Sequence, residues 1–143
     1  MQDGTYRRIA TGPTIIPLPK GKAPQSDVDA ALLMRFGYVK TPDVALNERA
    51  RAGLFGLATT LFNRTSVEPA PPDELDLETS PLELYPLIYF AVPENAAPMS
   101  ERAIARLNAY LRSGGALVID TRDGDTAGNT EISRLESLLE GLD

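Results

Sequence analysis

The sequence contains neither histidine nor cysteine, so its chemistry depends on carboxylates, amides, hydroxyls and basic side chains. Without those two residue types it supplies no Ser-His-Asp or Cys-His arrangement, no disulfide and no thiolate metal ligand. The remaining candidates gather in three short polar stretches, each of which follows an apolar run. They are Thr41 and Asp43, then Glu94 and Asn95, and finally Asp120, Thr121, Arg122 and Asp123.

These three polar stretches would meet if the apolar runs before them were parallel strands, because ligands of open parallel sheets bind beyond the carboxyl ends of the strands. We therefore expect a binding site for a small polar ligand, built from these eight residues. In the alternative interpretation, Asp43 caps a helix, Asp120 bonds turn amides and Arg122 pairs with a carboxylate. The residue types alone leave both interpretations open.

Metal or phosphate binding has weaker support in the sequence. Asp120, Asp123 and Asp125 carry the oxygen ligands that Mg²⁺ or Ca²⁺ prefers, but their spacing does not match an EF-hand loop and such turns are common. The pair Gly114-Gly115 follows a predicted helix instead of opening one, as a phosphate-binding loop would. We therefore predict no metal and no cofactor.

Four short segments predict strands, of which the apolar runs over 32–39 and 87–92 are expected to be buried in a sheet. The connection over 69–86 is acidic and rich in proline, so we expect it to be irregular. The predicted strands cover residues 32–39, 65–67, 87–92 and 116–119.

Helical spacing of leucines begins after Asp43, which is placed to cap the first helix. Gly53 and Gly56 within this helix lower its propensity, and we attribute them to a close approach between helix and sheet. Ser100 is placed to cap a second helix, which Gly114 ends. Apolar residues over 132–139 predict a last helix.

Strands that alternate with helices imply right-handed crossovers and a mainly parallel sheet. We therefore predict an α/β fold, a flavodoxin-like three-layer sandwich over residues 31–143, incomplete at its C-terminus because another strand would normally follow the last helix. Residues 1–30 are rich in proline and glycine and show no periodicity, which indicates a flexible linker or leader.

The net charge is −6, so nucleic acid and anionic membrane surfaces are poor partners. The longest apolar run, residues 84–92, is about half the length of a membrane span, so we expect a soluble domain that does not insert into a membrane.

Four stretches of the sequence resemble a bacterial family of uncharacterised domains with a class I glutamine-amidotransferase-like fold. They cover 36–41, 51–57, 86–90 and, most specifically, 104–123. In that family the domain often follows a membrane-embedded module of the aerotolerance-regulator type. The resemblance implies a parent protein anchored to the bacterial inner membrane, whose other domains are this domain's partners.

Glutamine amidotransferases use a cysteine nucleophile at a strand-to-helix elbow, served by histidine and glutamate. The comparable elbow here is residues 119–122, which has no cysteine, so the resemblance implies a fold without that activity. We favour a non-catalytic ligand-sensing or protein-interaction domain. The alternative is a hydrolase that uses carboxylates, assisted by a metal ion at Asp120 and Asp123.

Overall fold

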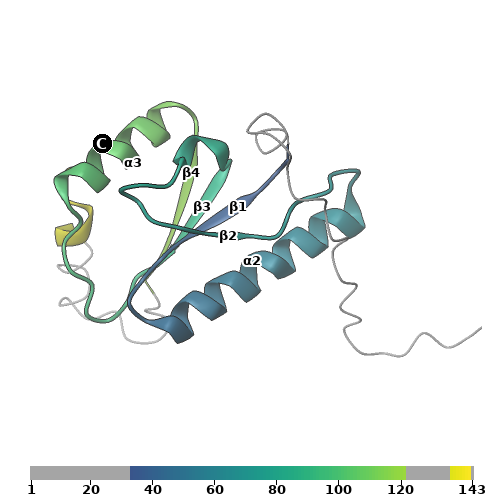
Figure 1. Cartoon of the computed structure of the whole chain (residues 1–143), viewed down its shortest axis with the longest axis horizontal. Coiled ribbons are helices and arrows are strands. Elements are labelled where there is room, and N and C mark those ends of the chain that lie inside the picture. The colour runs from purple at the N-terminus through teal and green to yellow at the C-terminus, as the bar shows by residue number, and fades with distance from the viewer. Residues whose placement is uncertain (1–32, 122–135, 143) are drawn as a thin grey trace, which may run out of the picture.

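The computed structural model describes residues 33–121 and 136–142, which form an α/β fold around one parallel sheet (Figure 1). The strand order is β2-β1-β3-β4, and all three strand pairs are parallel. A further helical turn covers residues 136–139. The elements are β1 (Phe36–Val39), α2 (Val44–Arg64), β2 (Asp73–Leu75), the 3₁₀ helix η1 (Leu82–Leu84), β3 (Leu87–Ala91), α3 (Glu101–Arg112) and β4 (Ala116–Asp120).

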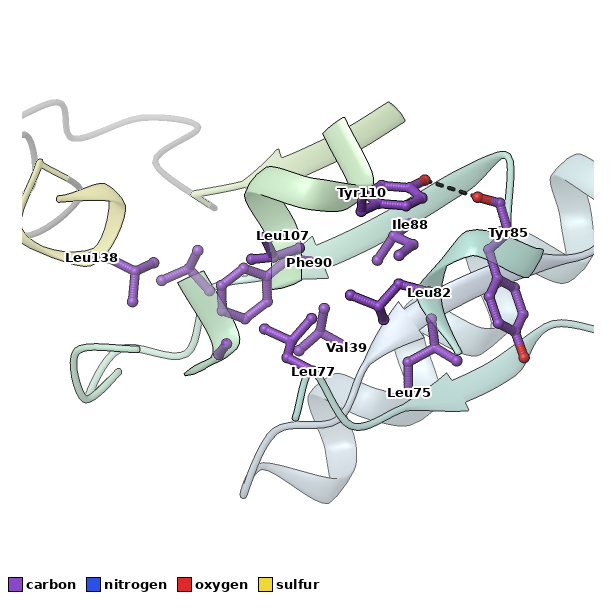
Figure 2. Close-up of a cluster of buried hydrophobic side chains, with 12 residues drawn as sticks. Val39, Leu75, Leu77, Leu82, Tyr85, Ile88, Phe90, Leu107, Tyr110 and Leu138 are labelled. Atoms are coloured by element: carbon purple, nitrogen blue, oxygen red, sulfur yellow. Dashed lines mark hydrogen bonds between the residues drawn. The ribbon is translucent and has the colours of Figure 1, made fainter. Parts of the chain in front are cut away.

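The two faces of the sheet are covered by different helices, as expected for a flavodoxin-like three-layer arrangement (Figure 1). Phe36 and Tyr38 of β1 pack against α2. The alternate residue Val39 and the fully buried Ile88 of β3 belong to a second cluster, with η1 and α3 on the opposite face (Figure 2). Burial on both faces explains why these strands are apolar runs instead of alternating ones.

The helix boundaries follow the capping signals in the sequence. The side chain of Asp43 accepts a hydrogen bond from the backbone N–H of Leu46, at 3.0 Å, and Ser100 accepts one from Ala103, at 3.1 Å. Gly114, after α3, has a φ of 97°, a conformation that glycine adopts without strain. The predicted caps and the predicted end of α3 are therefore confirmed.

The predicted strand at 65–67 is wrong, because α2 runs to Arg64 and Thr65 is its C-cap. Strand β2 instead begins at Asp73, inside the stretch that we expected to be irregular. Leu75 supplies the buried side chain there, with 1% of its surface exposed. The proline-rich composition of the stretch hid a strand of only three residues.

The close approach expected at Gly53 and Gly56 is also wrong, because both are exposed and have open space at the position of a β-carbon, although Gly53 lines a groove between α2 and the sheet. The glycines that do need their small size include Gly37 of β1, as well as Gly115, where a β-carbon would lie 2.2 Å from the Tyr110 ring. A β-carbon at Gly37 would lie 2.2 Å from Cδ1 of Leu75. Close packing between β1 and β2 therefore depends on a glycine in the strand.

One part of the α2 face of the sheet is not covered by α2. Val118 of β4 points to this face with 43% of its surface exposed, whereas its neighbours Leu117 and Ile119 pack on the α3 side. A groove runs between α2 and this part of the sheet, and Leu57 of α2, which is 41% exposed, lies on its other side. Strand β4 pairs only with β3 within the described residues, so it forms an edge of the sheet.

Hydrogen bonds connect all four strands at the amino ends. A carboxylate oxygen of Asp73 accepts from Arg35, at 3.1 Å, and from the Tyr85 hydroxyl, at 3.0 Å. The hydroxyl of Tyr110 donates to the carbonyls of Tyr85 and Ala116, at 2.9 and 3.0 Å, and Figure 2 shows the first of these contacts. We call these five residues the amino-edge network.

The network also changes the acidity of its tyrosines. Burial raises the pKa of Tyr85 to about 12, and the neighbouring Asp73 carboxylate contributes to the rise. Burial likewise raises the pKa of Tyr110. Both hydroxyls therefore stay protonated, and able to donate, at pH values where a tyrosine in the unfolded chain has lost its proton.

We predict that this protein loses stability between pH 10 and about 12. The unfolded chain releases the Tyr85 proton near pH 10 and the folded protein retains it to about pH 12, so the stabilisation is complete below pH 10 and is lost above it. Each proton held only by the folded state lowers the free energy of unfolding by about 1.4 kcal/mol for every pH unit. In urea unfolding across this range, the free energy of unfolding of Tyr85→Phe should fall less steeply with pH than that of the wild-type protein. Equal slopes for both proteins would contradict the prediction.

Candidate functional site

The strand order places a crevice at the carboxyl ends of β1 and β3. From β1 the chain crosses through α2 to β2 on one side, and β3 then pairs on the other side of β1. The two loops that leave β1 and β3 consequently diverge toward opposite faces of the sheet, which is the usual location of a ligand site in such sheets.

A cavity of about 440 Å³ occupies this position, and we call it the switch-point cavity. Three segments form its walls: the end of β1, the loop after β2, and the segment that joins β3 to α3. The lining residues are Val39, Lys40, Thr41, Pro42, Asp76, Leu77, Glu78, Phe90, Pro93, Asn95, Ala96, Ala97, Met99 and Ala103.

Apolar side chains make up most of this lining. Val39, Leu77, Phe90 and Ala103 are buried members of the core on the α3 side, and Met99 packs against that core. The floor of the cavity is therefore continuous with the hydrophobic core. An apolar floor with a few polar groups is typical of small-molecule sites.

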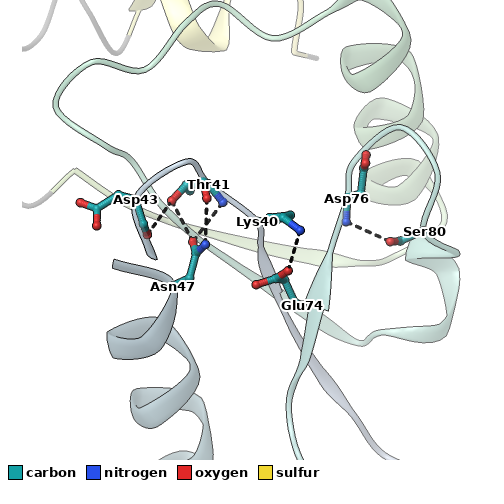
Figure 3. Close-up of polar contacts among 7 residues, drawn as sticks. All are labelled: Lys40, Thr41, Asp43, Asn47, Glu74, Asp76 and Ser80. Atoms are coloured by element: carbon teal, nitrogen blue, oxygen red, sulfur yellow. Dashed lines mark hydrogen bonds and ion pairs between the residues drawn. The ribbon is translucent and has the colours of Figure 1, made fainter. Parts of the chain in front are cut away.

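The first wall is fixed by a closed set of hydrogen bonds between Thr41 and Asn47 (Figure 3). The amide oxygen of Asn47 accepts from the backbone N–H and the hydroxyl of Thr41, at 3.0 and 2.8 Å. Its amide nitrogen donates to the Thr41 carbonyl, at 2.8 Å. Both residues are buried, so these bonds hold the loop after β1 in one conformation.

The second wall, residues 76–80, is tied to α3. The Asp76 carboxylate accepts from the backbone N–H of Glu78, at 2.7 Å. The Glu78 carboxylate accepts from the Ser100 hydroxyl, at 2.6 Å, and Arg106 donates to the carbonyls of Glu78 and Ser80. Hydrogen bonds to its acidic side chains and to its backbone therefore hold the loop that follows the short strand β2.

A second pocket, which we call the polar annex, adjoins the switch-point cavity and shares Pro42, Pro93 and Asn95 with it. Its other lining residues are charged: Asp43, Arg49 and Glu94. One of the Asp43 oxygens already caps α2. The annex therefore adds carboxylates and a guanidinium to the more apolar cavity.

The structure brings together only part of the site expected from the sequence. Thr41 and Asn95 line the cavity, and Asp43, Glu94 and Asn95 line the annex. Asp120 ends β4 as expected, but neither it nor the half-buried Thr121 lines either pocket. Arg122 and Asp123 lie outside the described residues, as do Asp125 and the leader over 1–30.

Asp120 has a partner that the sequence did not indicate. The Tyr89 hydroxyl of β3 donates to its carboxylate, and the Arg122 that the sequence suggests as a partner lies outside the described residues. Strand pairing of Ala91 with Asp120 places Tyr89 two residues away along the neighbouring strand. This contact joins β3 to β4 on the α2 side of the sheet.

Sequence reasoning missed the loop after β2 and the side chains of Asn47 and Arg49. The loop was missed because the strand before it was misplaced. Leucine alternates with acidic residues over 74–78, and this period of two could have revealed β2 and the outward direction of Asp76 and Glu78. No sequence signal distinguishes the buried Asn47 from other polar residues of a helix.

The described residues hold no group of three or more acidic, histidine or cysteine side chains placed to bind a metal ion. In the same part of the chain, no helix combines the length and the apolar character that a membrane span requires.

Residues 35–142 match the family described as a domain of unknown function, DUF4159. The match covers most of the chain, and the protein belongs to this family. No curated protein matches the sequence.

We expect Asn47→Ala to lower the free energy of unfolding by about 1–3 kcal/mol, because it removes the bonds that the Asn47 amide makes to the buried backbone N–H and carbonyl of Thr41. The exposed Asn63→Ala on the same helix is the matched control and should change stability by less than about 0.5 kcal/mol. Urea unfolding measures both. Equal effects of the two substitutions would show that the Thr41–Asn47 bonds do not stabilise the loop.

The contact between Tyr89 and Asp120 should appear as an energetic coupling between these positions. In a double-mutant cycle with Tyr89→Phe and Asp120→Ala, we expect the pair to couple by about 0.5–3 kcal/mol, measured by denaturant unfolding. Additive losses would contradict this, because they would show that the two side chains stabilise the protein independently.

Proposed function

We propose that this domain binds a small molecule in the switch-point cavity and does not transform it. The single observation that carries the proposal is a cavity of about 440 Å³ at the point where the strand order reverses. Its size lies within the range of small-molecule sites, about 300–1,000 Å³.

Two properties of the walls support binding. The apolar floor offers a surface on which a ligand loses unfavourable contact with water. The walls are already held by the Thr41–Asn47 bonds and by the contacts of Ser100 and Arg106, so a ligand need not order them on binding. Such preorganisation reduces the entropic cost of association.

The chemistry of the side chains supports binding over glutamine hydrolysis. The scaffold resembles that of class I glutamine amidotransferases, yet the chain supplies no thiol to form a thioester and no imidazole to resolve one. We place the ligand in the cavity and not at Asp120, because the Asp120 carboxylate accepts the Tyr89 hydroxyl on the α2 face. In the membrane-anchored parent that the resemblance implies, neighbouring domains would respond to occupancy of the cavity.

Filling the cavity tests this proposal. Ala97 lines the cavity and is exposed, so Ala97→Trp should block the site while leaving the core intact. Ala52→Trp, on the exposed side of α2, is the matched control. Compounds that raise the melting temperature of the wild-type protein should lose at least about nine-tenths of their affinity for Ala97→Trp, the loss that a clash of about 1.4 kcal/mol produces.

The control should retain wild-type affinity for the same compounds. If compounds bind Ala97→Trp as tightly as the wild-type protein, then binding occurs elsewhere and the proposed site is wrong. If a broad collection of metabolites stabilises neither protein, the proposal of a small-molecule domain fails.

A further inference from the structure

We infer that the ligand of the switch-point cavity carries a positive charge, as a primary ammonium group on an apolar body. This inference rests on the proposed function and adds to it the chemical class of the ligand. It follows from the charges around the cavity and the annex, taken with the apolar floor of the cavity.

Carboxylates outnumber cations around the two connected pockets. Asp76 and Glu78 line the cavity. Asp43 and Glu94 line the annex. The cations on the same walls are Lys40 in the cavity and Arg49 in the annex. Four negative groups therefore line the two pockets with two positive ones, and a third cation, Arg106, donates to the Glu78 and Ser80 carbonyls of the loop that carries Asp76 and Glu78.

The positive charge of Lys40 is already matched by a carboxylate outside the lining. Its ammonium nitrogen lies 3.1 Å from a carboxylate oxygen of Glu74 on β2 (Figure 3). This ion pair weakens the attraction between the Lys40 ammonium group and an anionic ligand. Glu74 and Arg106 both lie outside the lining and carry opposite charges, so the surroundings of the two pockets keep the net negative excess of the lining residues.

The hydrogen bonds of the acidic side chains hold them in position without removing their charge. Asp76 accepts from a backbone N–H and Glu78 from a hydroxyl, and both donors are neutral groups. Two oriented carboxylates at the rim of an apolar cavity produce a negative potential there, because low-dielectric walls focus the field. That potential attracts an ammonium group and repels a carboxylate.

The shape of the site indicates the structure of the uncharged part of the ligand. Phe90, Leu77 and Met99 offer apolar contact in the interior, and the carboxylates lie on one loop at the side. A compound with a hydrocarbon body and a charge at one end can satisfy both surfaces. Phenethylamine and 3-phenylpropionate are suitable probes, because they share an aromatic body and a short linker and carry opposite charges.

We would titrate the ¹⁵N-labelled full chain with each probe at low ionic strength and follow the backbone amides of the cavity, including Phe90, Asn95 and Met99. Phenethylamine should bind at least about fivefold more tightly than 3-phenylpropionate, as expected for one charge near a partly screened pair of carboxylates. The preference should shrink toward parity in about 0.5 M salt, where charges are screened within a few ångströms.

A matched pair of variants assigns the preference to the cavity. Asp76→Asn with Glu78→Gln removes two negative charges but keeps the oxygens that accept hydrogen bonds from the loop and from Ser100. Glu48→Gln with Glu83→Gln removes two exposed charges that line neither pocket. Only the first pair should abolish the preference for the amine.

The outcomes separate this inference from the proposed function. If 3-phenylpropionate binds the cavity as tightly as the amine or more tightly, the ligand class is wrong and the binding function stands. If both variant pairs reduce the preference equally, net charge and not the cavity selects the amine, and the inference is again wrong. If neither probe perturbs the cavity amides, the inference fails, and the proposed function is decided separately by the metabolite collection and the Ala97→Trp variant.

Discussion

The amino-edge network determines how the four strands are held relative to one another. A single carboxylate, Asp73, accepts from Arg35 before β1 and from Tyr85 before β3. The Tyr110 hydroxyl then extends the connection from α3 to β4 through the Ala116 carbonyl. Because these polar groups are wholly or partly buried, each would cost free energy without its partner, and together they fix the register at one end of the sheet.

Because the amino-edge network holds the strands at one end, the loops at their carboxyl ends can form a site. The loops after β1 and β3 diverge there, and separate hydrogen bonds hold two of the three walls: Asn47 fixes the first, while Ser100 and Arg106 fix the second. Hydrogen bonds hold these walls while apolar side chains form the floor between them. A cavity can therefore persist beside the core without collapse, because the surrounding loops are not free to fill it.

The charge distribution around the cavity is a consequence of the same architecture. Asp76 and Glu78 face outward because Leu75 and Leu77, which alternate with them, are buried in the core. Lys40 follows a buried strand and pairs with Glu74 on the neighbouring strand. Side chains alternate between the core and the surface along β2 and the loop after it. The site is acidic because the side chains directed away from the core are carboxylates.

The elements that the sequence determined are those whose signals are local. The buried strands β1 and β3, the edge strand β4, the caps at Asp43 and Ser100, and the end of α3 at Gly114 all depend on residues within a few positions of one another. From these the parallel sheet and the place of Thr41, Asp43, Glu94 and Asn95 near its carboxyl edge could be predicted. The residues also sufficed to exclude thiol and imidazole chemistry from this chain.

Tertiary structure decided the features that depend on distant partners. The alternation over 74–78 indicates a strand, but it does not identify its partners: Leu75 is buried in the core, and Asp73 accepts from Arg35 and Tyr85. The same holds for Gly37, where any side chain would clash with Leu75. It also holds for Asp120, which accepts a hydrogen bond from Tyr89 on the neighbouring strand. Cavity walls are assembled from segments tens of residues apart, so only the packing of the whole chain brings Asp76 and Glu78 to the site.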